Sequence, residues 1–408
     1  MKDFFKVTDL ESVLEYAYDF PRVETEEVLL YKSSQRILAA DIISEADLPD
    51  FARSTMDGYA VRASSTFGIT EGNPAYLTVK GSVVMGKSPP FSIGQGEAAG
   101  ISTGGMMPDG ADSVVMIEYT ELIDETTIEV YKSVAPGLHV VEVGEDFCRG
   151  ETILSNGQKL RPQETGLLAA FGKERVRVYK KPVIGIISTG DEVVPIDKSP
   201  GPGQIRDVNT YTLSSLVQEA GGIPVSFGII QDDYDSLFTA CSLALDQSDM
   251  VLISGGSSVG ARDFTIDALS ALPESKILAH GISISPGKPT ILARAAGKPL
   301  WGLPGHVVSA IIVFSNVVRP FIEHIGGLSM QNKKITASAL LTRNIPSSQG
   351  RIDYVRVRLI EKDGALWAEP IFGKSGLINT MVKADGLVAI GINTEGIDKG
   401  KKVSVIPL

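Results

Sequence analysis

The clearest chemical signal in the sequence lies at residues 251–264, where a short apolar run ends in small residues and a carboxylate follows. Val251-Leu252-Ile253 is typical of a buried strand, and Ser254-Gly255-Gly256-Ser257-Ser258-Val259-Gly260 is typical of a glycine-rich turn. Glycines let backbone N–H groups approach an anion, and a helix beginning near Asp263 would favour negative charge there. Asp263 could hold a metal ion against an anionic substrate, or could be the N-cap of an ordinary strand-to-helix turn.

Similar clusters follow other predicted strands. Each cluster contains polar or charged residues, and most also contain glycine or proline. The clusters are Ser188-Thr189-Gly190-Asp191-Glu192, Asp232-Asp233, Pro286-Gly287-Lys288-Pro289 and Leu303-Pro304-Gly305-His306. In open α/β sheets, ligands bind beyond the carboxyl ends of the strands. We therefore expect these clusters to converge on one crevice.

The segment 183–324 contains the elements that must position these clusters. Strand patterns at 183–187, 223–230, 251–253 and 276–284 alternate with helical patterns that begin after Asn209, after Asp233, at Asp263 and at Val307. This alternation predicts a doubly wound α/β domain, with a parallel-rich sheet and helices on both faces. We expect this domain to span residues 181–326.

The regions on either side of this segment have different sequence patterns. Short strand patterns with turn signals predict a β-rich domain over residues 51–145 and a small β-barrel or sandwich over 327–408. Residues 1–50 and 146–180 read as a mixed linking domain, with helical patterns at 8–20, 24–38 and 164–171. Near the C-terminus, Val355, Val357 and Leu359 should face one way while Arg356 and Arg358 face the other.

Composition and charge exclude several classes of protein. The 408 residues carry a formal net charge of −11, so no basic stripe is available for a nucleic acid. No apolar run reaches the ~18 residues of a membrane span, and the N-terminus does not resemble a signal peptide. Cys148 and Cys241 have no disulfide or zinc spacing and are interpreted as reduced core residues. We expect a cytoplasmic protein.

Taken together, the motifs resemble those of the MoeA-type molybdopterin molybdenumtransferases, which are related to the C-terminal part of gephyrin. Eight motifs carry the resemblance, in the same order and over essentially the whole chain: Ser54-Thr55-Met56-Asp57-Gly58-Tyr59-Ala60-Val61-Arg62, Ser102-Thr103-Gly104, Gly144-Glu145-Asp146, Ser188-Thr189-Gly190-Asp191-Glu192, Asp207-Val208-Asn209, Ser254-Gly255-Gly256-Ser257-Ser258-Val259-Gly260, Pro286-Gly287-Lys288-Pro289 and Leu303-Pro304-Gly305. The resemblance implies four domains, the last a small β-barrel, in a homodimer. Its site would lie between the α/β domain of one subunit and the β-rich domain of the other.

The resemblance also implies the reaction. Molybdate would be inserted into adenylylated molybdopterin, and AMP would be released in a Mg²⁺-dependent step. Asp263 would be the metal ligand and the residue most tied to activity, Glu192 would order metal-bound water or the pterin, and Lys288 would meet molybdate or phosphate. Asp57 and Thr103 would reach in from the second domain, of the partner subunit. The substrate-binding residues implied are Ser254, Gly255, Gly256, Ser257, Ser258, Gly260, Thr189, Gly190, Pro304, Gly305, His306, Ser309, Asp146 and Asp232.

Each of these roles has a structural alternative. Glu192 and Lys288 could be solvated surface residues. Asp57 could be a turn residue beside Gly58, and Thr103 could bond its own backbone. The same applies to three further residues, which could serve only the local fold: Asp146, Asp232 and His306.

Two departures from the family pattern concern the oxyanion. Ser285 stands where the family often has the first lysine of Lys-Pro-Gly-Lys-Pro, and another family lysine falls near His280. The loss of two cations leaves open how the oxyanion is held, and whether it is molybdate or tungstate. His306-Val307 replaces Asn-Pro of the family, which frees a backbone N–H at a helix start.

Two other functions stay open. The α/β domain alone also resembles molybdopterin adenylyltransferases, but the flanking β-rich domains and Met56-Asp57-Gly58-Tyr59-Ala60 argue against that function. The third possibility is a non-catalytic dimer that binds molybdopterin as a scaffold. The presence of Asp263, Glu192 and Lys288 favours an enzyme.

Overall fold

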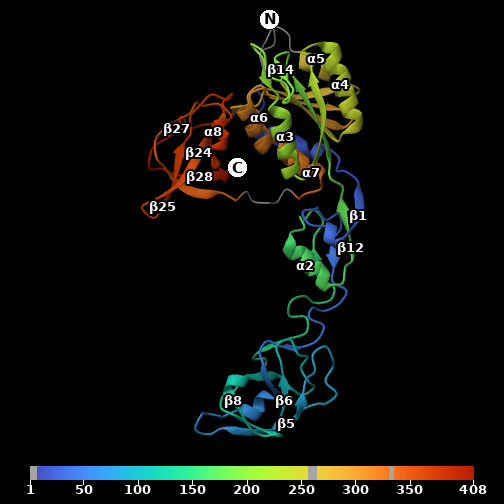
Figure 1. Cartoon of the computed structure of the whole chain (residues 1–408), viewed down its shortest axis with the longest axis vertical. Helices are drawn as coiled ribbons and strands as arrows, with labels where there is room; N and C mark the ends of the chain where they lie inside the picture. Colours follow the sequence, from blue (N-terminus) through green and yellow to red (C-terminus); the bar gives the residue numbers. More distant parts are fainter. Residues whose placement is uncertain (1–6, 256–263, 330–334) are drawn as a thin grey trace. The chain divides into compact units, whose positions relative to one another are not determined.

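The computed structural model describes residues 7–255, 264–329 and 335–408 (Figure 1). The chain divides into two compact units. One comprises the chain to Ala40, Asn156–Thr165 and Glu174–Leu408, and the other comprises Asp41–Ser155 and Gly166–Lys173. The expected boundaries of the four domains stay a prediction.

The centre of the first unit is a six-stranded sheet in the order β16-β13-β17-β21-β20-β18. Four neighbouring strands are parallel: β16 (Ile223–Ile230), β13 (Val183–Thr189), β17 (Met250–Ser254) and β21 (Lys298–Leu303). The other two are antiparallel to their neighbours: β20 (Ile291–Ala295) and β18 (Lys276–His280). The sheet is therefore parallel-rich, as the sequence predicted. Every residue of β17 is buried, because helices cover both of its faces.

Alternate residues of the central strands separate two hydrophobic cores. Ile186, Leu252 and Trp301 pack against one group of helices: α1 (Leu10–Glu15), α3 (Asn209–Glu219), α6 (Val307–Val313) and α7 (Arg319–Ile325). Ile187 and Val251 point the other way and pack against α4 (Tyr234–Gln247) and α5 (Phe264–Ser270). The prediction of helices on both faces is confirmed.

Helix α6 continues through a π-helical turn, Phe314–Val318, into α7. Within the described residues, Val307–Ile325 is the helix that is long and apolar enough to cross a membrane, but 72% of it is buried inside the protein. Phe314, Val317 and Phe321 are fully buried in the core shared with the sheet. This apolar segment is therefore a core helix.

The N-terminal region differs from its prediction at residues 24–38. The helix expected there is wrong: Thr25–Leu29 forms strand β1, antiparallel to β12 (Arg175–Tyr179), and a short 3₁₀ turn follows. A partner strand about 150 residues away supplies the backbone hydrogen bonds, so tertiary pairing overrides the weak local helical pattern. Helix α1 is also shorter than expected. Asp9 is its N-cap, and the Asp9 carboxylate accepts hydrogen bonds from the backbone N–H groups of Glu11 and Ser12.

The C-terminal region is a closed five-stranded barrel with the strands β22 (Ala337–Leu341), β24 (Ile352–Lys362), β25 (Ala365–Pro370), β26 (Gly386–Ile390) and β28 (Lys402–Pro407). Pairing of β24 with β26 closes the ring. Val355, Val357 and Leu359 face its core as predicted. Arg356 points the other way but is buried, and donates hydrogen bonds to Thr380 Oγ1 and Gly373 O, both at 2.9 Å.

The strand expected at 276–284 is interrupted. Strand β18 ends at His280, and Ile284–Ser285 forms a separate strand, β19, that pairs with β24 of the barrel. The chain therefore leaves the α/β sheet before it reaches the Pro286-Gly287-Lys288-Pro289 turn. Position 285 belongs to the edge of the barrel sheet.

The second unit contains a six-stranded sheet in the order β7-β4-β6-β5-β9-β8. Its strands are β4 (Gly58–Val61), β5 (Ala75–Ser82), β6 (Glu97–Ile101), β7 (Ser113–Met116), β8 (Thr120–Asp124) and β9 (Thr127–Val130). The β-rich character of this region is confirmed. Cys148 lies in the same unit and is exposed, so the prediction of a core position holds only for Cys241. Burial raises the pKa of the Cys241 thiol to about 12.

Candidate active site

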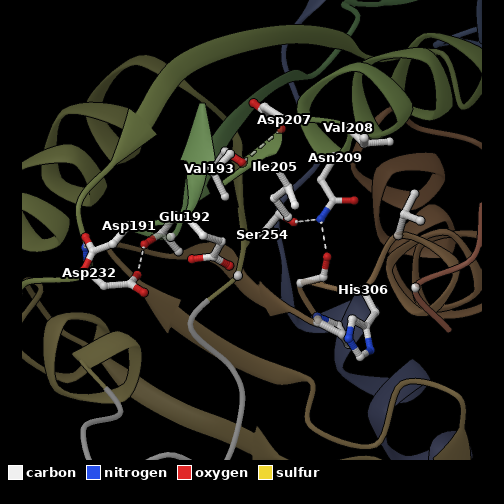
Figure 2. A pocket seen from close by; sticks show the side chains of 18 of the residues that line it. Asp191, Glu192, Val193, Ile205, Asp207, Val208, Asn209, Asp232, Ser254 and His306 are labelled. Atoms are coloured by element: carbon white, nitrogen blue, oxygen red, sulfur yellow. Dashed lines mark hydrogen bonds between the residues drawn. The ribbon is translucent and has the colours of Figure 1, made fainter. Parts of the chain in front are cut away.

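A crevice of about 1330 Å³ opens at the carboxyl ends of the parallel strands (Figure 2). Its walls come from the segments that follow β13, β16, β17 and β21, together with the first turn of α3. The parallel sheet requires this convergence, because all four strands end at the same edge. The lining includes these predicted residues: Thr189, Gly190, Glu192, Asp232, Ser254, Gly255, Lys288, Pro304, Gly305 and His306.

Other predicted residues are not in this lining. Gly256, Ser257, Ser258, Gly260 and Asp263 lie outside the described residues. Ser309 is buried within α6 rather than exposed on the crevice wall. Asp146 belongs to the other unit, where it is exposed and its backbone N–H donates to Leu48 O at 3.0 Å. The predicted roles of these residues stay predictions.

Gly255 is required by the close approach of two strand ends. Its φ is +110°, and a Cβ there would lie 2.3 Å from Thr189 O. The backbone of β17 therefore passes directly beside the end of β13, where a larger residue would force the two apart. This packing leaves bare backbone at the crevice, which is the property that anion-binding turns use.

The ends of β13 and β16 are joined by side chains. Thr189 Oγ1 donates a hydrogen bond to Asp232 Oδ1, and the backbone N–H of Asp232 donates to Asp191 Oδ1 at 3.2 Å. One carboxylate oxygen of Asp232 therefore accepts a hydrogen bond from a neighbouring strand end, and the residue also lines the crevice. The structural alternative for Asp232 and a role in binding are compatible.

Asn209 ties three segments together, and it was not among the predicted site residues. Its Nδ2 donates to Ser254 Oγ at 2.6 Å and to Gly305 O at 2.8 Å, which joins α3 to the ends of β17 and β21 (Figure 2). Its neighbour Asp207 accepts hydrogen bonds from Ser188 Oγ at 3.1 Å and Thr210 N at 3.0 Å. The motif Asp207-Val208-Asn209 was visible in the sequence, but its partners become neighbours only in the folded sheet.

Lys288 is the predicted cation of the crevice. It is exposed, and its amine makes no hydrogen bond or ion pair with the described residues. Gly287 before it has φ +121°, and a Cβ there would lie 2.4 Å from Val313 Cγ2. The turn is therefore packed closely against the C-terminal end of α6, and this packing fixes the place from which Lys288 extends.

His306 lies at the start of α6 and lines the crevice, as the sequence suggested. Its Nδ1 is 2.8 Å from Ser375 Oγ, and Val308 N donates to Ser375 O at 3.1 Å. Gly376 also lines the crevice. The C-terminal part of the chain therefore contributes to this site, which the sequence had not suggested.

Glu192 and Arg206 complete the charged lining. Glu192 follows β13, and its Oε2 lies 2.9 Å from where a Cβ on Gly190 would stand, so the carboxylate folds back over bare backbone. Arg206 was not predicted. It ends the short strand β15 (Ile205–Arg206), paired with β14 (Val193–Val194), and its Nε donates to Ile196 O at 3.2 Å. An exposed arginine on a two-residue strand has no distinguishing mark in a single sequence.

Asp57 and Thr103 lie together in the second unit. Asp57 Oδ1 accepts hydrogen bonds from Thr103 N at 2.7 Å and from Thr103 Oγ1 at 3.2 Å. Both residues are exposed, at the ends of the neighbouring strands β4 and β6. A Cβ on Gly58 would lie 2.0 Å from Val115 O, so the backbone next to Asp57 is packed tightly against strand β7. The two motifs therefore form one exposed polar corner.

A metal ion would find few protein ligands in the described part of the crevice. Within residues 7–255, 264–329 and 335–408, no three His, Cys, Asp or Glu side chains gather closely enough to hold one. Mg²⁺ is commonly bound by one or two carboxylates plus substrate phosphates and waters. The donor set around Glu192 and Asp232 fits that pattern better than it fits a closed protein cage.

Comparison with known proteins gives a consistent result over nearly the whole chain. A molybdopterin molybdenumtransferase of Bacillus subtilis is 33% identical over 94% of this chain and 90% of its own length. A solved molybdopterin biosynthesis moeA protein of Pyrococcus horikoshii is 31% identical, with a TM-score of 0.85 over 99% of this chain and 100% of its own. Another structure of that kind of protein from the same species is 39% identical, with a TM-score of 0.79 over 98% and 99%.

Three family models match successive parts of the chain. The MoeA N-terminal region (domain I and II) matches residues 7–172, the probable molybdopterin binding domain matches 185–324, and the MoeA C-terminal region (domain IV) matches 338–408. The crevice described above is lined mainly by the second of these regions. The chain therefore belongs to the MoeA family of molybdopterin molybdenumtransferases, which act in molybdenum cofactor biosynthesis.

Proposed function

We propose that this protein inserts molybdate, or tungstate, into adenylylated molybdopterin and releases AMP in a Mg²⁺-dependent reaction. The observation that carries the proposal is the crevice, in which bare backbone, several carboxylates and a lysine without a partner among the described residues meet at four strand ends. Both the oxyanion and the phosphate linkage of this substrate are anions. Backbone N–H groups and a free cation are the groups that bind them in an acidic protein.

Lys288 is the residue to which we assign the oxyanion or a substrate phosphate. Its amine has no protein partner among the described residues, so binding an anion breaks no existing ion pair. Ser254, Gly255, Pro304 and Gly305 line the wall that would accept the rest of the linkage. Asn209 supports this wall by holding Ser254 and Gly305 at fixed positions.

We assign Mg²⁺ to the acidic side of the crevice, with Asp263 as its protein ligand. When bound, Mg²⁺ would neutralise charge on the phosphate oxygens. Glu192 is placed to hold a water molecule or a polar group of the pterin, and Asp232 has a second carboxylate oxygen available for the same purpose. These two carboxylates would orient substrate and solvent around the phosphate linkage.

We further propose that the working form is a homodimer, in which Asp57 and Thr103 of a second copy complete the site. These two residues form an exposed polar corner that is held by its own hydrogen bonds and by a tightly packed glycine. An exposed and preorganised polar corner is suited to meeting a substrate held elsewhere. We infer that the reaction takes place in the cytoplasm, where an exposed thiol such as that of Cys148 stays reduced.

The test is AMP release from adenylylated molybdopterin with Mg²⁺ and either molybdate or tungstate. We expect the unmodified protein to release AMP with one or both oxyanions, and Asp263→Ala to abolish release while the oligomeric state is unchanged. Undiminished release by Asp263→Ala would remove its assigned role. Comparison of the two oxyanions at equal concentration would show which is the substrate.

The same assay separates the alternatives. A protein that instead forms adenylylated molybdopterin from molybdopterin and ATP would be an adenylyltransferase. Binding of molybdopterin without turnover under either condition would indicate a scaffold. The matches to the N-terminal and C-terminal MoeA regions support the insertion reaction over adenylylation, because they extend well beyond the molybdopterin binding domain.

A further inference from the structure

A small hollow of about 50 Å³ lies at the amino ends of the parallel strands, at the edge of the sheet opposite to the crevice. Pro182 directly precedes β13 and Gly221 lies two residues before β16, and both line this hollow. The rest of its wall comes from residues 35–37, Lys159, the end of β12 and the helices α3 and α7. All of these segments belong to the first unit. The hollow is therefore separate from the site of the proposed reaction.

Basic side chains dominate this hollow, although the chain as a whole has a formal net charge of −11. Two carboxylates line it, those of Glu219 and Glu323. The five cations of the lining are Arg36, Lys159, Lys180, Lys181 and Arg319. Positive charge gathered in one place attracts an anion, even in an acidic protein.

Three of these cations already have carboxylate partners. The ion pairs are Arg36–Glu26, Lys180–Glu24, Arg319–Glu219 and Arg319–Glu323. The amines of Lys159 and Lys181 make no hydrogen bond or ion pair with the residues that the structure describes. Five cations therefore face four carboxylates, and the excess of positive charge resides on the two unpaired lysines.

Arg36 provides hydrogen-bond donors that the fold holds in place. Its side chain is 11% exposed, and its Nη2 donates to Tyr179 O at 2.7 Å as well as to Glu26. Its Nε and Nη1 have no hydrogen-bond partner in the described parts of the chain. Because a guanidinium is planar, fixing one of its nitrogens also fixes the others, which suits an anion with several oxygens.

The size of the hollow restricts its occupant. A water molecule needs roughly 10–15 Å³ of such a cavity, so about 50 Å³ accommodates a few waters or one anion of the size of phosphate. Sites for drug-sized ligands are usually roughly 300–1,000 Å³. A nucleotide or a pterin is therefore too large for this hollow.

We propose that this hollow is an anion site, which binds a small tetrahedral oxyanion such as phosphate or sulfate through Lys159, Lys181 and Arg36. The bound anion would connect residues 35–37 and Lys159 to the segment that enters β13, and would stabilise the folded chain. Another explanation is that the lysines only balance the ends of α3 and α7, because helix C-termini favour cations. The two explanations differ in whether an added oxyanion binds.

The experiment is isothermal titration calorimetry of inorganic phosphate into the full chain carrying Lys288→Ala, at an ionic strength held constant with sodium chloride. This background removes the cation to which we assign anions in the crevice. We expect phosphate to bind to this protein, and sulfate to compete with it. Adding Lys159→Ala and Lys181→Ala should weaken phosphate binding roughly tenfold or more, because two charge-assisted hydrogen bonds are lost.

The matched control is the pair Lys362→Ala and Lys399→Ala in the same background. It removes the same charge from two exposed lysines of the barrel region and should leave phosphate binding unchanged. Lys159→Arg with Lys181→Arg should retain most of the affinity, because the charges and donors remain. Thermal unfolding without phosphate checks that each variant is folded, and added phosphate should raise the Tm of the control pair but not of the Lys159→Ala and Lys181→Ala pair.

Three results would overturn the proposal. The first is the absence of phosphate binding in the Lys288→Ala protein, which would leave the lysines as partners of the helix ends. The second is an equal loss of affinity in the two alanine pairs, which would show that only net charge matters. The third is unchanged affinity in the Lys159→Ala and Lys181→Ala pair. No substrate of the proposed reaction is present, so the result does not depend on that reaction.

Discussion

Some crevice side chains are hydrogen-bonded to neighbouring segments, and others have no such partner among the described residues. Asp232, Asp207 and Ser254 each have hydrogen bonds to neighbouring segments. Lys288 has none among the described residues. An unpaired cation destabilises a protein only when it is buried. An exposed lysine on a tightly packed turn stays hydrated and can bind an anion.

Lys288 therefore carries the first residue-scale prediction. Lys288→Ala should lower kcat/KM for the adenylylated substrate roughly 10- to 100-fold, since a hydrogen bond to a charged group contributes about 1.5–3 kcal/mol. Lys288→Arg should retain most of the activity at low salt. Lys32→Ala, which removes an exposed lysine outside the crevice, is the matched control. If both alanine variants were equally active, Lys288 would be a surface lysine.

At the scale of elements, two contacts between distant segments hold the site together. The first is the Asn209 bridge from α3 to β17 and β21. Since Gly305 O can only accept, Nδ2 must face it, and the orientation of the amide follows. We propose that Asn209 acts on the substrate through Ser254 and Gly305, as a positioning residue.

Asn209→Asp should keep the fold but lower kcat more than it raises KM, because a carboxylate cannot donate to Gly305 O. We expect a loss of roughly 10- to 100-fold in kcat/KM, because the bond to Gly305 O is replaced by repulsion between two oxygens, although the Ser254 hydroxyl can still donate to the carboxylate. Asn393→Ala, at an exposed asparagine in the barrel region, should have no effect. Equal activities of the two variants, measured as AMP release at saturating substrate, would show that the bridge is only structural.

The second contact explains the departure at position 285. Ser285 on β19 pairs with Asp353 on β24, and the Ser285 side chain contributes to lowering the pKa of that carboxyl. Asp353 also accepts hydrogen bonds from Ser347 Oγ at 2.7 Å and Arg351 Nε at 3.0 Å. Ser285 is not in the crevice lining and instead fastens the barrel to the α/β region. In this chain the residue at that position serves the fold.

Asp353 gives the prediction for pH. Burial opposes its ionisation, but hydrogen bonds from Ser347 and Ser285 and the charge of Arg351 outweigh that cost and lower its pKa. A lowered folded-state pKa stabilises the protein above the unfolded pKa, and the effect is lost as the pH falls through the folded pKa. Asp353→Asn should therefore cost about 2 kcal/mol at neutral pH and progressively less in acid.

Urea unfolding of the full chain, followed by tryptophan fluorescence between pH 3 and pH 7, measures this difference. Trp367 on β25 reports on the barrel, and Trp301 on β21 reports on the α/β sheet. Asp398→Asn is the matched control, because the Asp398 carboxylate is exposed and has no hydrogen bond with the described residues. A difference between Asp353→Asn and the unmodified protein that stays constant with pH would contradict the assignment.

At the scale of the whole molecule, the proposed homodimer would combine groups from the two units of different copies. The α/β crevice contains the groups to which we assign the anions, and the polar corner of Asp57 and Thr103 belongs to the other unit. If the site is shared between two copies, each copy supplies the group that the other needs. A defect in one unit can then be compensated by a partner with a defect in the other.

Mixing Asp263→Ala with Asp57→Ala tests this directly. After random exchange, half of the dimers would contain one copy of each variant, and one of their two shared sites would be intact. AMP release should recover to about a quarter of the unmodified activity, as the symmetry of a two-fold dimer requires. Mixed dimers that form but stay inactive would show that each site is built from one chain, whereas full activity of Asp57→Ala on its own would show that Asp57 has no role.

The sequence by itself determined which residues follow which strands. The alternation of strand and helix patterns was enough to predict the doubly wound sheet. Polar residues beside glycine at the strand ends were enough to predict the crevice. Each of these features is formed by residues that are close together in the chain, so it can be recognised from the sequence. The alternation of Val355, Val357 and Leu359 was recognisable for the same reason.

Only the tertiary structure decided the contacts between residues far apart in the chain. Strand β1 replaced an expected helix because its partner, β12, lies about 150 residues away. Asn209 became part of the site because α3 lies beside the ends of β17 and β21, and Ser285 became part of the barrel through Asp353. Such contacts depend on long-range pairing and close packing, which are properties of the folded chain and leave no fixed spacing in the sequence.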